Sequence, residues 1–78
     1  PNPFNPVITL DIDIHRSGEL RIEVYDVSGN SLGVINNGYV NAGNQSFQWI
    51  GKNSSSGMYF FKITDGGIVQ IRKAVLLK

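Results

Sequence analysis

The residue types that usually carry catalysis or bind metals are scarce in this chain, which has one histidine and no cysteine among its 78 residues. His15 stands where an alternating segment runs into the turn Ser17-Gly18, and a lone histidine without cysteine does not build a common zinc site. The serines 54–56 cluster, but no Gly-x-Ser-x-Gly elbow surrounds them. Because the sequence offers no nucleophile–base pair or metal constellation, we predict that the chain is not an enzyme and needs no cofactor.

Two carboxylates, Asp11 and Asp13, stand two residues apart, which places them on the same face of a strand. The spacing Asp-x-Asp-x-Asp-Gly is not present, so the sequence does not indicate a calcium loop. We interpret the pair as solvated side chains on the outer face of a sheet. Incidental calcium binding is the alternative.

Aromatic rings can form a platform for sugars, and the chain has one tryptophan and three tyrosines. Trp49 shares its strand parity with Phe47, and Tyr59 shares its parity with Phe61, which favours packing in a core for both. The two other tyrosines are too few to indicate a carbohydrate module.

The end of the sequence combines an apolar strand pattern with cations, and its last seven residues are candidates for a recognition signal: Arg72, Lys73, Ala74, Val75, Leu76, Leu77 and Lys78. One face of the segment carries Lys73 with the apolar residues Ile71, Val75 and Leu77, and the other carries Gln70, Arg72 and Ala74. The pattern predicts a terminal strand docked on a core, with basic side chains left exposed for another protein to bind. The alternative is an ordinary last strand with solvated lysines.

The start of the sequence, Pro1-Asn2-Pro3-Phe4-Asn5-Pro6, is rich in proline and lacks an initiator methionine. Proline fixes φ and pushes the preceding residue into an extended conformation, so residues 1–6 are expected to form a stiff lead-in. We expect the chain to be part of a longer protein, which this lead-in joins to an upstream domain. A PxxP ligand motif is the less favoured interpretation of the same residues.

Composition excludes several classes of function. The net charge is +1, which gives no electrostatic basis for binding nucleic acid. The sequence contains no apolar stretch long enough to span a bilayer, so we predict no membrane insertion. Only 17% of the residues are charged, and glycine, asparagine and serine are frequent, which favours an extracellular β domain.

The apolar residues repeat with the period of strands and show no convincing helix. We expect strands at residues 7–14, 20–25, 32–35, 45–49, 58–64 and 68–77. The third is short and is followed by a loop that carries Tyr39 and Val40, and Asp65-Gly66 forms a two-residue hairpin turn before the last strand. The pattern predicts one domain over residues 1–78, an all-β, small Ig-like antiparallel β-sandwich of six to seven strands.

Several short motifs follow one another along nearly the whole chain: Pro1-Asn2-Pro3-Phe4-Asn5-Pro6, Val24-Tyr25-Asp26 with Gly29, Ala42-Gly43, Trp49 with Gly51, Ser56-Gly57-Met58-Tyr59-Phe60-Phe61, and Arg72-Lys73 through Leu77-Lys78. In this order and spacing the chain resembles the C-terminal sorting domain of proteins exported by the type IX secretion system of Gram-negative bacteria. It departs from the family pattern at Ile50, where aspartate is usual, and at Ala74, where methionine is common.

The resemblance implies a non-catalytic Ig-like sandwich that tags an upstream cargo protein for export. The implied partners are the outer-membrane export machinery, a sortase-like peptidase and the covalently linked cargo domain. The cargo would pass through the periplasm and be secreted or held at the cell surface. The resemblance gives Gly29, Gly43 and Gly57 the role of turn residues and places Trp49 and Tyr59 in the core.

The same pattern also occurs in the Ig-like domain of flagellar hook-capping proteins and in accessory domains of secreted hydrolases. An accessory domain with a structural or ligand-binding role is therefore the alternative function. One observation separates the two: a sorting signal must end the reading frame at Lys78, whereas an accessory domain can lie anywhere in its parent protein.

Overall fold

The computed structural model of the chain describes residues 6–78, so five of the six predicted lead-in residues, Pro1, Asn2, Pro3, Phe4 and Asn5, lie outside the described part. The described residues form six strands, namely β1 (Val7–Ile14), β2 (Gly18–Tyr25), β3 (Ser31–Val40), β4 (Gly43–Ile50), β5 (Gly57–Asp65) and β6 (Ile68–Leu76). All pairings between these strands are antiparallel. The predicted all-β class is confirmed.

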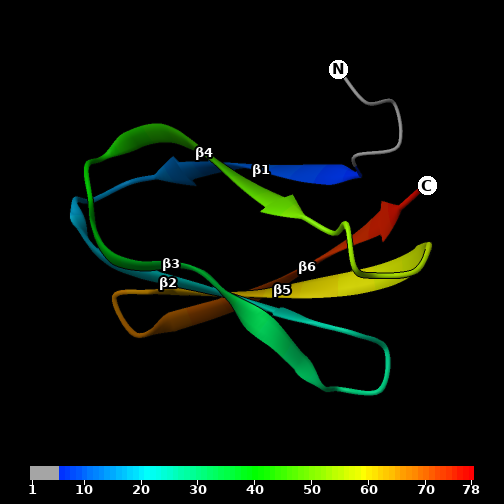
Figure 1. Ribbon diagram of the computed structural model, residues 1–78. Coiled ribbons are helices and arrows are strands. Elements are labelled where there is room, and N and C mark those ends of the chain that lie inside the picture. Colours follow the sequence, from blue (N-terminus) through cyan, green and yellow to red (C-terminus); the bar gives the residue numbers. More distant parts are fainter. Residues whose placement is uncertain (1–5) are drawn as a thin grey trace.

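The strands form two sheets that face each other across a single core (Figure 1). One sheet has two strands, β1 and β4, and the other has four in the order β3-β2-β5-β6. In Figure 1 the two-stranded sheet lies above the four-stranded one. The arrangement is the small antiparallel sandwich that the sequence predicts, with six strands in the described part.

Strict alternation in the sequence explains why β1 and β2 form where they do. In β1 every second side chain is buried, from Ile8 to Ile14, and the intervening residues are exposed. In β2 the buried positions are Leu20, Ile22 and Val24. Since successive side chains of a strand point to opposite faces, each strand buries one apolar row and exposes one polar row.

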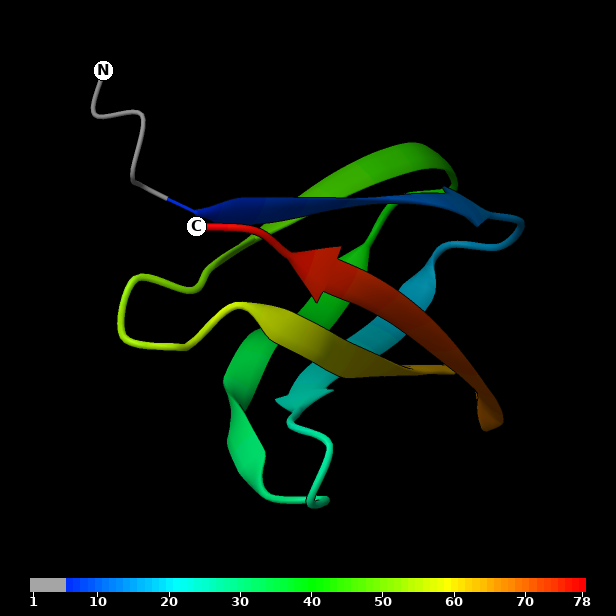
Figure 2. The ribbon, with the colours of Figure 1, turned by 90° about the vertical axis from the view of Figure 1, so that its right-hand side faces the viewer.

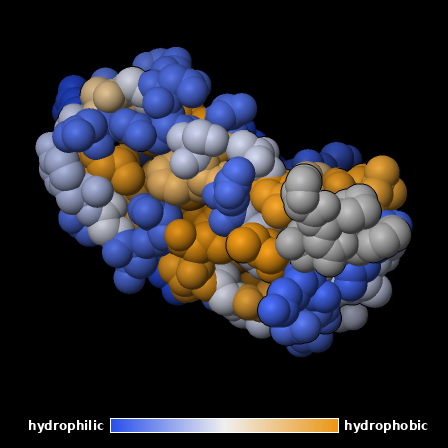
Figure 3. Space-filling view, turned by 45° about the horizontal axis from the view of Figure 1, so that its top comes forward, coloured by the Kyte–Doolittle hydropathy of each residue, from blue (hydrophilic) through white to orange (hydrophobic). Residues whose placement is uncertain are grey.

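Among residues 6–78, the buried side chains of the core are all apolar or aromatic. The largest fully buried ones are Phe61, Leu20, Ile22 and Ile63, together with Ile14, Leu76 and Val24. The rings of Trp49 and Tyr59 close the core at one end, with their centroids 4.9 Å apart. Both rings are buried, as predicted. On the face that Figure 3 shows, apolar side chains reach the surface in the middle, with hydrophilic ones around them.

The third strand is longer than the sequence pattern indicates, and the expectation of a short strand at 32–35 was wrong. β3 runs from Ser31 to Val40 and pairs along the whole of β2, including Tyr39 opposite Glu19 and Val40 opposite Gly18. The segment Asn36-Asn37-Gly38 has weak intrinsic strand propensity, but a ladder of backbone hydrogen bonds to a neighbouring strand overrides propensity. Two register shifts in this pair absorb the irregular pattern.

The β5–β6 hairpin is present as predicted, but its turn lies one residue further along. Asp65 pairs with Ile68, so the two loop residues are Gly66 and Gly67, not Asp65 and Gly66. Both glycines have positive φ, 55° and 85°. A two-residue hairpin turn of type I′ requires positive φ at both positions, and a pair of glycines adopts it without steric cost.

Candidate recognition site on the last strand

β6 lies at an edge of the four-stranded sheet, where it pairs with β5 alone. Its other edge faces β1, the edge strand of the opposite sheet. Figures 1 and 2 show the end of β6 at the same end of the sandwich as the start of β1. The candidate signal residues therefore lie on the side of the sandwich where β6 and β1, strands of different sheets, face each other.

The structure decides which face of β6 packs on the core, which the sequence pattern left open. Ile71, Val75 and Leu77 are exposed, by 58%, 55% and 79%. The inward side chains are those of Arg72, Ala74 and Leu76, with Leu76 1% exposed. Leu76 stands opposite Gly57 and Ala74 opposite Tyr59, and Tyr59 points into the core, so the register with β5 fixes which face of β6 is buried.

Arg72 connects the two sheets. Its Nη1 atom donates a hydrogen bond of 2.7 Å to the backbone carbonyl oxygen of Asp11 on β1. The side chain is half-buried. A guanidinium is well suited to this position because it satisfies a carbonyl on an unpaired strand edge while keeping contact with water. Arg72 therefore has a structural role in the sandwich, beyond any contribution to recognition.

Leu76 is the anchor of the tail in the core. A Cβ atom placed on the buried Gly51 would lie 2.7 Å from Cδ2 of Leu76 and 3.1 Å from two ring carbons of Trp49. The Gly51 N–H also donates a 3.0 Å hydrogen bond to the carbonyl oxygen of Pro6. Gly51 thus leaves the space that lets Leu76 and Trp49 pack together at the start of the β4–β5 loop.

Replacing Gly51 with alanine is expected to lower the free energy of unfolding by about 1–3 kcal/mol, as overpacking of a filled core does. Leu76 cannot move aside easily, because it is itself fully buried. The matched control is Gly38→Ala, since a Cβ at Gly38 meets no atom within 4 Å and its φ is not positive. Urea denaturation of both variants measures the difference, and equal midpoints would contradict the packing argument.

The two residues after Leu76 continue along the β4–β5 loop. The backbone N–H of Lys78 donates a 3.1 Å hydrogen bond to Oγ of Ser56, and its Nζ donates a 3.1 Å hydrogen bond to the carbonyl oxygen of Lys52. These contacts hold the last residue in place although its side chain is exposed. The serine-rich loop 51–56 therefore supports the tail.

Of the seven candidate residues, three have no inward contact: Lys73, Val75 and Leu77 all point to solvent. Lys73 forms no ion pair with another residue in the described part of the chain. The site thus presents one cation and two apolar side chains, held by the buried Leu76, with Lys78 fixed beside them. Such a surface can bind a partner non-covalently, and it has no group placed for catalysis.

The other residues with chemical potential do not come together. His15 is exposed at the β1–β2 turn, and Asp11 and Asp13 are exposed on the outer face of β1. Residues 6–78 contain no group of three or more histidine, cysteine or carboxylate side chains placed to hold a metal. Within the same residues, no helix is long and apolar enough to cross a membrane.

The positions of the family pattern in the described part lie in a turn, at the first residue of two strands, and in the core. Gly29 has a φ of 85° and lies in the turn between β2 and β3. Gly43 begins β4, and Gly57 begins β5. The buried ring of Tyr59 donates a 2.6 Å hydrogen bond from its hydroxyl to the carbonyl oxygen of Ser55, which ties the serine-rich loop to the core.

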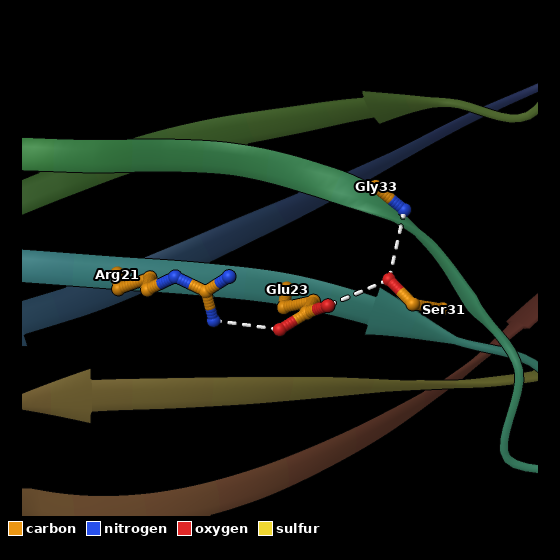
Figure 4. A network of polar contacts seen from close by, with 4 residues as sticks. All are labelled: Arg21, Glu23, Ser31 and Gly33. Carbon is orange, nitrogen blue, oxygen red and sulfur yellow. Dashed lines mark hydrogen bonds and ion pairs between the residues drawn. The ribbon is translucent and has the colours of Figure 1, made fainter.

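A polar network on β2 and β3 was not predicted from the sequence (Figure 4). Arg21 Nη1 donates a 2.6 Å hydrogen bond to Oε1 of Glu23, and Ser31 Oγ donates one of 2.6 Å to Oε2. The backbone N–H of Gly33 donates to Ser31 Oγ over 3.4 Å. The only signal in the sequence was the Arg21-x-Glu23 spacing, which places both side chains on one face of a strand.

Hydrogen bonds from Ser31, Arg21 and Tyr25 lower the pKa of Glu23 to about 2, so this carboxylate is ionised at neutral pH. The same contact with Glu23 raises the pKa of Tyr25. Both oxygens of the Glu23 carboxylate accept hydrogen bonds from within the hairpin. We therefore assign the network to holding the irregular β2–β3 pair, and not to catalysis.

The family described as "Secretion system C-terminal sorting domain" has a model that matches residues 1–77. No curated protein and no solved structure matches the chain significantly. The match covers nearly the whole chain and agrees with a small antiparallel sandwich. The chain therefore belongs to the family of secretion system C-terminal sorting domains, non-catalytic modules of the type IX secretion system that direct cargo for export to the cell surface or the medium.

Proposed function

We propose that the outer-membrane export machinery binds this domain through the exposed side of its last strand and of the tail that follows. The observation that carries the proposal is the facing of β6: Leu76 is buried, whereas Lys73, Val75 and Leu77 point to solvent. A strand needs only its inward row to fold, so an outward row of cations and apolar residues is available for recognition.

The proposal gives the residues 72–78 different roles. Leu76 and Ala74 dock the strand, and Arg72 fastens it to β1 through Asp11. Lys73 and Lys78 supply positive charge, and Val75 and Leu77 supply apolar contact. In this proposal, residues 1–78 act as one domain joined to an upstream cargo protein, which crosses the periplasm before export. A sortase-like peptidase then releases the cargo from the domain.

The sharpest test reverses the charge of the tail without removing the strand. The double variant Lys73→Glu/Lys78→Glu, fused behind a reporter in a host with a type IX system, is expected to accumulate in the periplasm. Exposed substitutions change stability by only about 0.5 kcal/mol each. A partner that recognises positive charge would instead lose binding through like-charge repulsion.

The matched control is Arg16→Glu/Asn44→Glu/Gln48→Glu, which changes the net charge by the same amount at exposed positions outside β6 and outside the loop that supports the tail. Secreted and periplasmic reporter are quantified for parent, test and control, and a thermal melt confirms that all three fold. Parental export of a folded test variant would exclude charge recognition of the tail. Equal loss in test and control would point to net charge, not to a site.

A further inference from the structure

The outer face of the β5–β6 hairpin is unusually apolar for a solvent-facing sheet surface. In register across the two strands, Met58 stands opposite Val75, and Phe60 stands opposite Lys73. The next pairs are Lys62 with Ile71 and Thr64 with Val69. On β6 the apolar members of this face are 51–58% exposed, and on β5 they are half-buried. Directly opposite residues are about 5 Å apart at Cβ and diagonal ones about 7–8 Å, so the apolar side chains and the two lysines form one surface across the two strands.

The outer face of the other sheet, formed by β1 and β4, serves as a comparison. There β1 and β4 expose mainly polar residues, namely Thr9, Asp11, Asp13, Asn44, Ser46 and Gln48. Apolar residues occur only at one end of that face, where Val7 pairs with Ile50. Antiparallel sandwiches normally expose polar residues on their outer faces, so the two faces of this molecule differ in a way that folding does not require.

The charges on the β5–β6 face are of one sign. Lys62 and Lys73 lie within the patch, and none of the eight outward positions of these strands carries a carboxylate. The nearest carboxylate in register, Glu23, stands opposite Lys62 but is already bound by Arg21 and Ser31. A complementary surface would therefore carry acidic groups in its middle, opposite the two lysines, with apolar side chains around them.

We infer that the outer face of β5 and β6, formed by Met58, Phe60, Lys62, Ile71, Lys73 and Val75, is a docking surface for an apolar, acidic protein surface of the secretion machinery. The inference rests on the proposed function and extends the recognition site from the tail onto β5. Lys73 and Val75 belong both to the recognition site on the tail and to this docking surface. Large exposed apolar patches mark interaction sites, and the two lysines within this patch select an acidic partner.

The test replaces apolar side chains of this face by threonine, which keeps the branched shape and strand propensity. The variant Ile71→Thr/Val75→Thr, in the full chain behind a reporter, is expected to lower the secreted fraction by about tenfold, because it removes apolar contact at the interface. The matched control is Val7→Thr/Ile50→Thr, which makes the same two exchanges at exposed positions on the opposite sheet. Ile71→Thr alone serves if the double variant melts below the parent.

The possible outcomes distinguish failure of the docking surface from failure of the proposed function. Parental export of the Ile71→Thr/Val75→Thr variant would overturn both the docking face and the apolar contact proposed for Val75. Export still lost in Lys73→Glu/Lys78→Glu would then leave only charge recognition of the tail standing. Equal loss in the Val7→Thr/Ile50→Thr control would also overturn it. Sedimentation measures whether the parent self-associates. Self-association that is lost in the test variant would assign the face to a second copy of the chain instead. A parent that fails to direct export would refute both proposals.

Discussion

Replacing Phe61 with alanine is expected to destabilise the sandwich by roughly 3–5 kcal/mol, the usual cost of removing a large aromatic side chain from a packed core. Phe61 is 0% exposed and lies opposite Val24 on β2 and Arg72 on β6. Its ring meets that of Trp49 edge-on, with centroids 6.0 Å apart. The neighbouring side chains come from both sheets and cannot all collapse into the cavity.

The loss is large relative to the total stability. A domain of this size is stabilised by about 4–12 kcal/mol, so the Phe61→Ala chain is expected to be partly unfolded at 37 °C. Trp49→Ala should cost a similar amount, since that ring contacts both Phe61 and Tyr59. The control is Tyr39→Ala, because Tyr39 is 66% exposed. If thermal melts of the Phe61 and Tyr39 variants coincide, the assignment of the core is wrong.

Replacing Leu76 with alanine is expected to cost about 2–5 kcal/mol, whereas the same change at its neighbour Leu77 should stay within about 0.5 kcal/mol. The two leucines are adjacent, but Leu76 is 1% exposed and Leu77 is 79% exposed. Leu76 fills the space beside Gly51 and Trp49, so its loss frees the tail from the core. Chemical denaturation of both variants gives the comparison directly.

The same pair separates docking of the tail from recognition of the tail. Leu76→Ala should reduce export together with stability, because the strand that presents Lys73 is no longer fixed. Leu77→Ala should leave stability unchanged and report only on contact with the partner. If Leu76→Ala were exported normally despite a much lower melting temperature, a folded last strand would not be required for recognition.

The sequence predicted the parts of the fold that depend on strict alternation. β1 and β2 each have an unbroken row of apolar residues at every second position, so burial of one face follows from hydrophobicity alone. Trp49, Tyr59 and Phe61 were assigned to the core by the same parity argument and are buried. In these segments, local pattern and tertiary packing point to the same answer.

The pattern failed where pairing, not hydrophobicity, decides the structure. β3 contains polar residues and glycine in its middle, yet its backbone pairs with β2 over its whole length. In β6 both faces carry apolar residues, so periodicity could not choose between them, and register with β5 placed Arg72 and Leu76 inward. The hydrogen bond from Arg72 to Asp11 joins residues far apart in sequence, so no local pattern could predict it.

The pairing of β1 with β4 has a consequence for the order of folding. The strands β2 and β3 lie between them in the sequence, so this sheet can close only after the β2–β3 segment has turned back on itself, whereas the β5–β6 hairpin forms locally. Sheets of such non-local pairs fold slowly, in about milliseconds to seconds. During that interval, the apolar side chains from Ile8 to Ile14 remain exposed to solvent. The charges of Asp11 and Asp13, interleaved with that row, would then keep unfinished chains from pairing with one another.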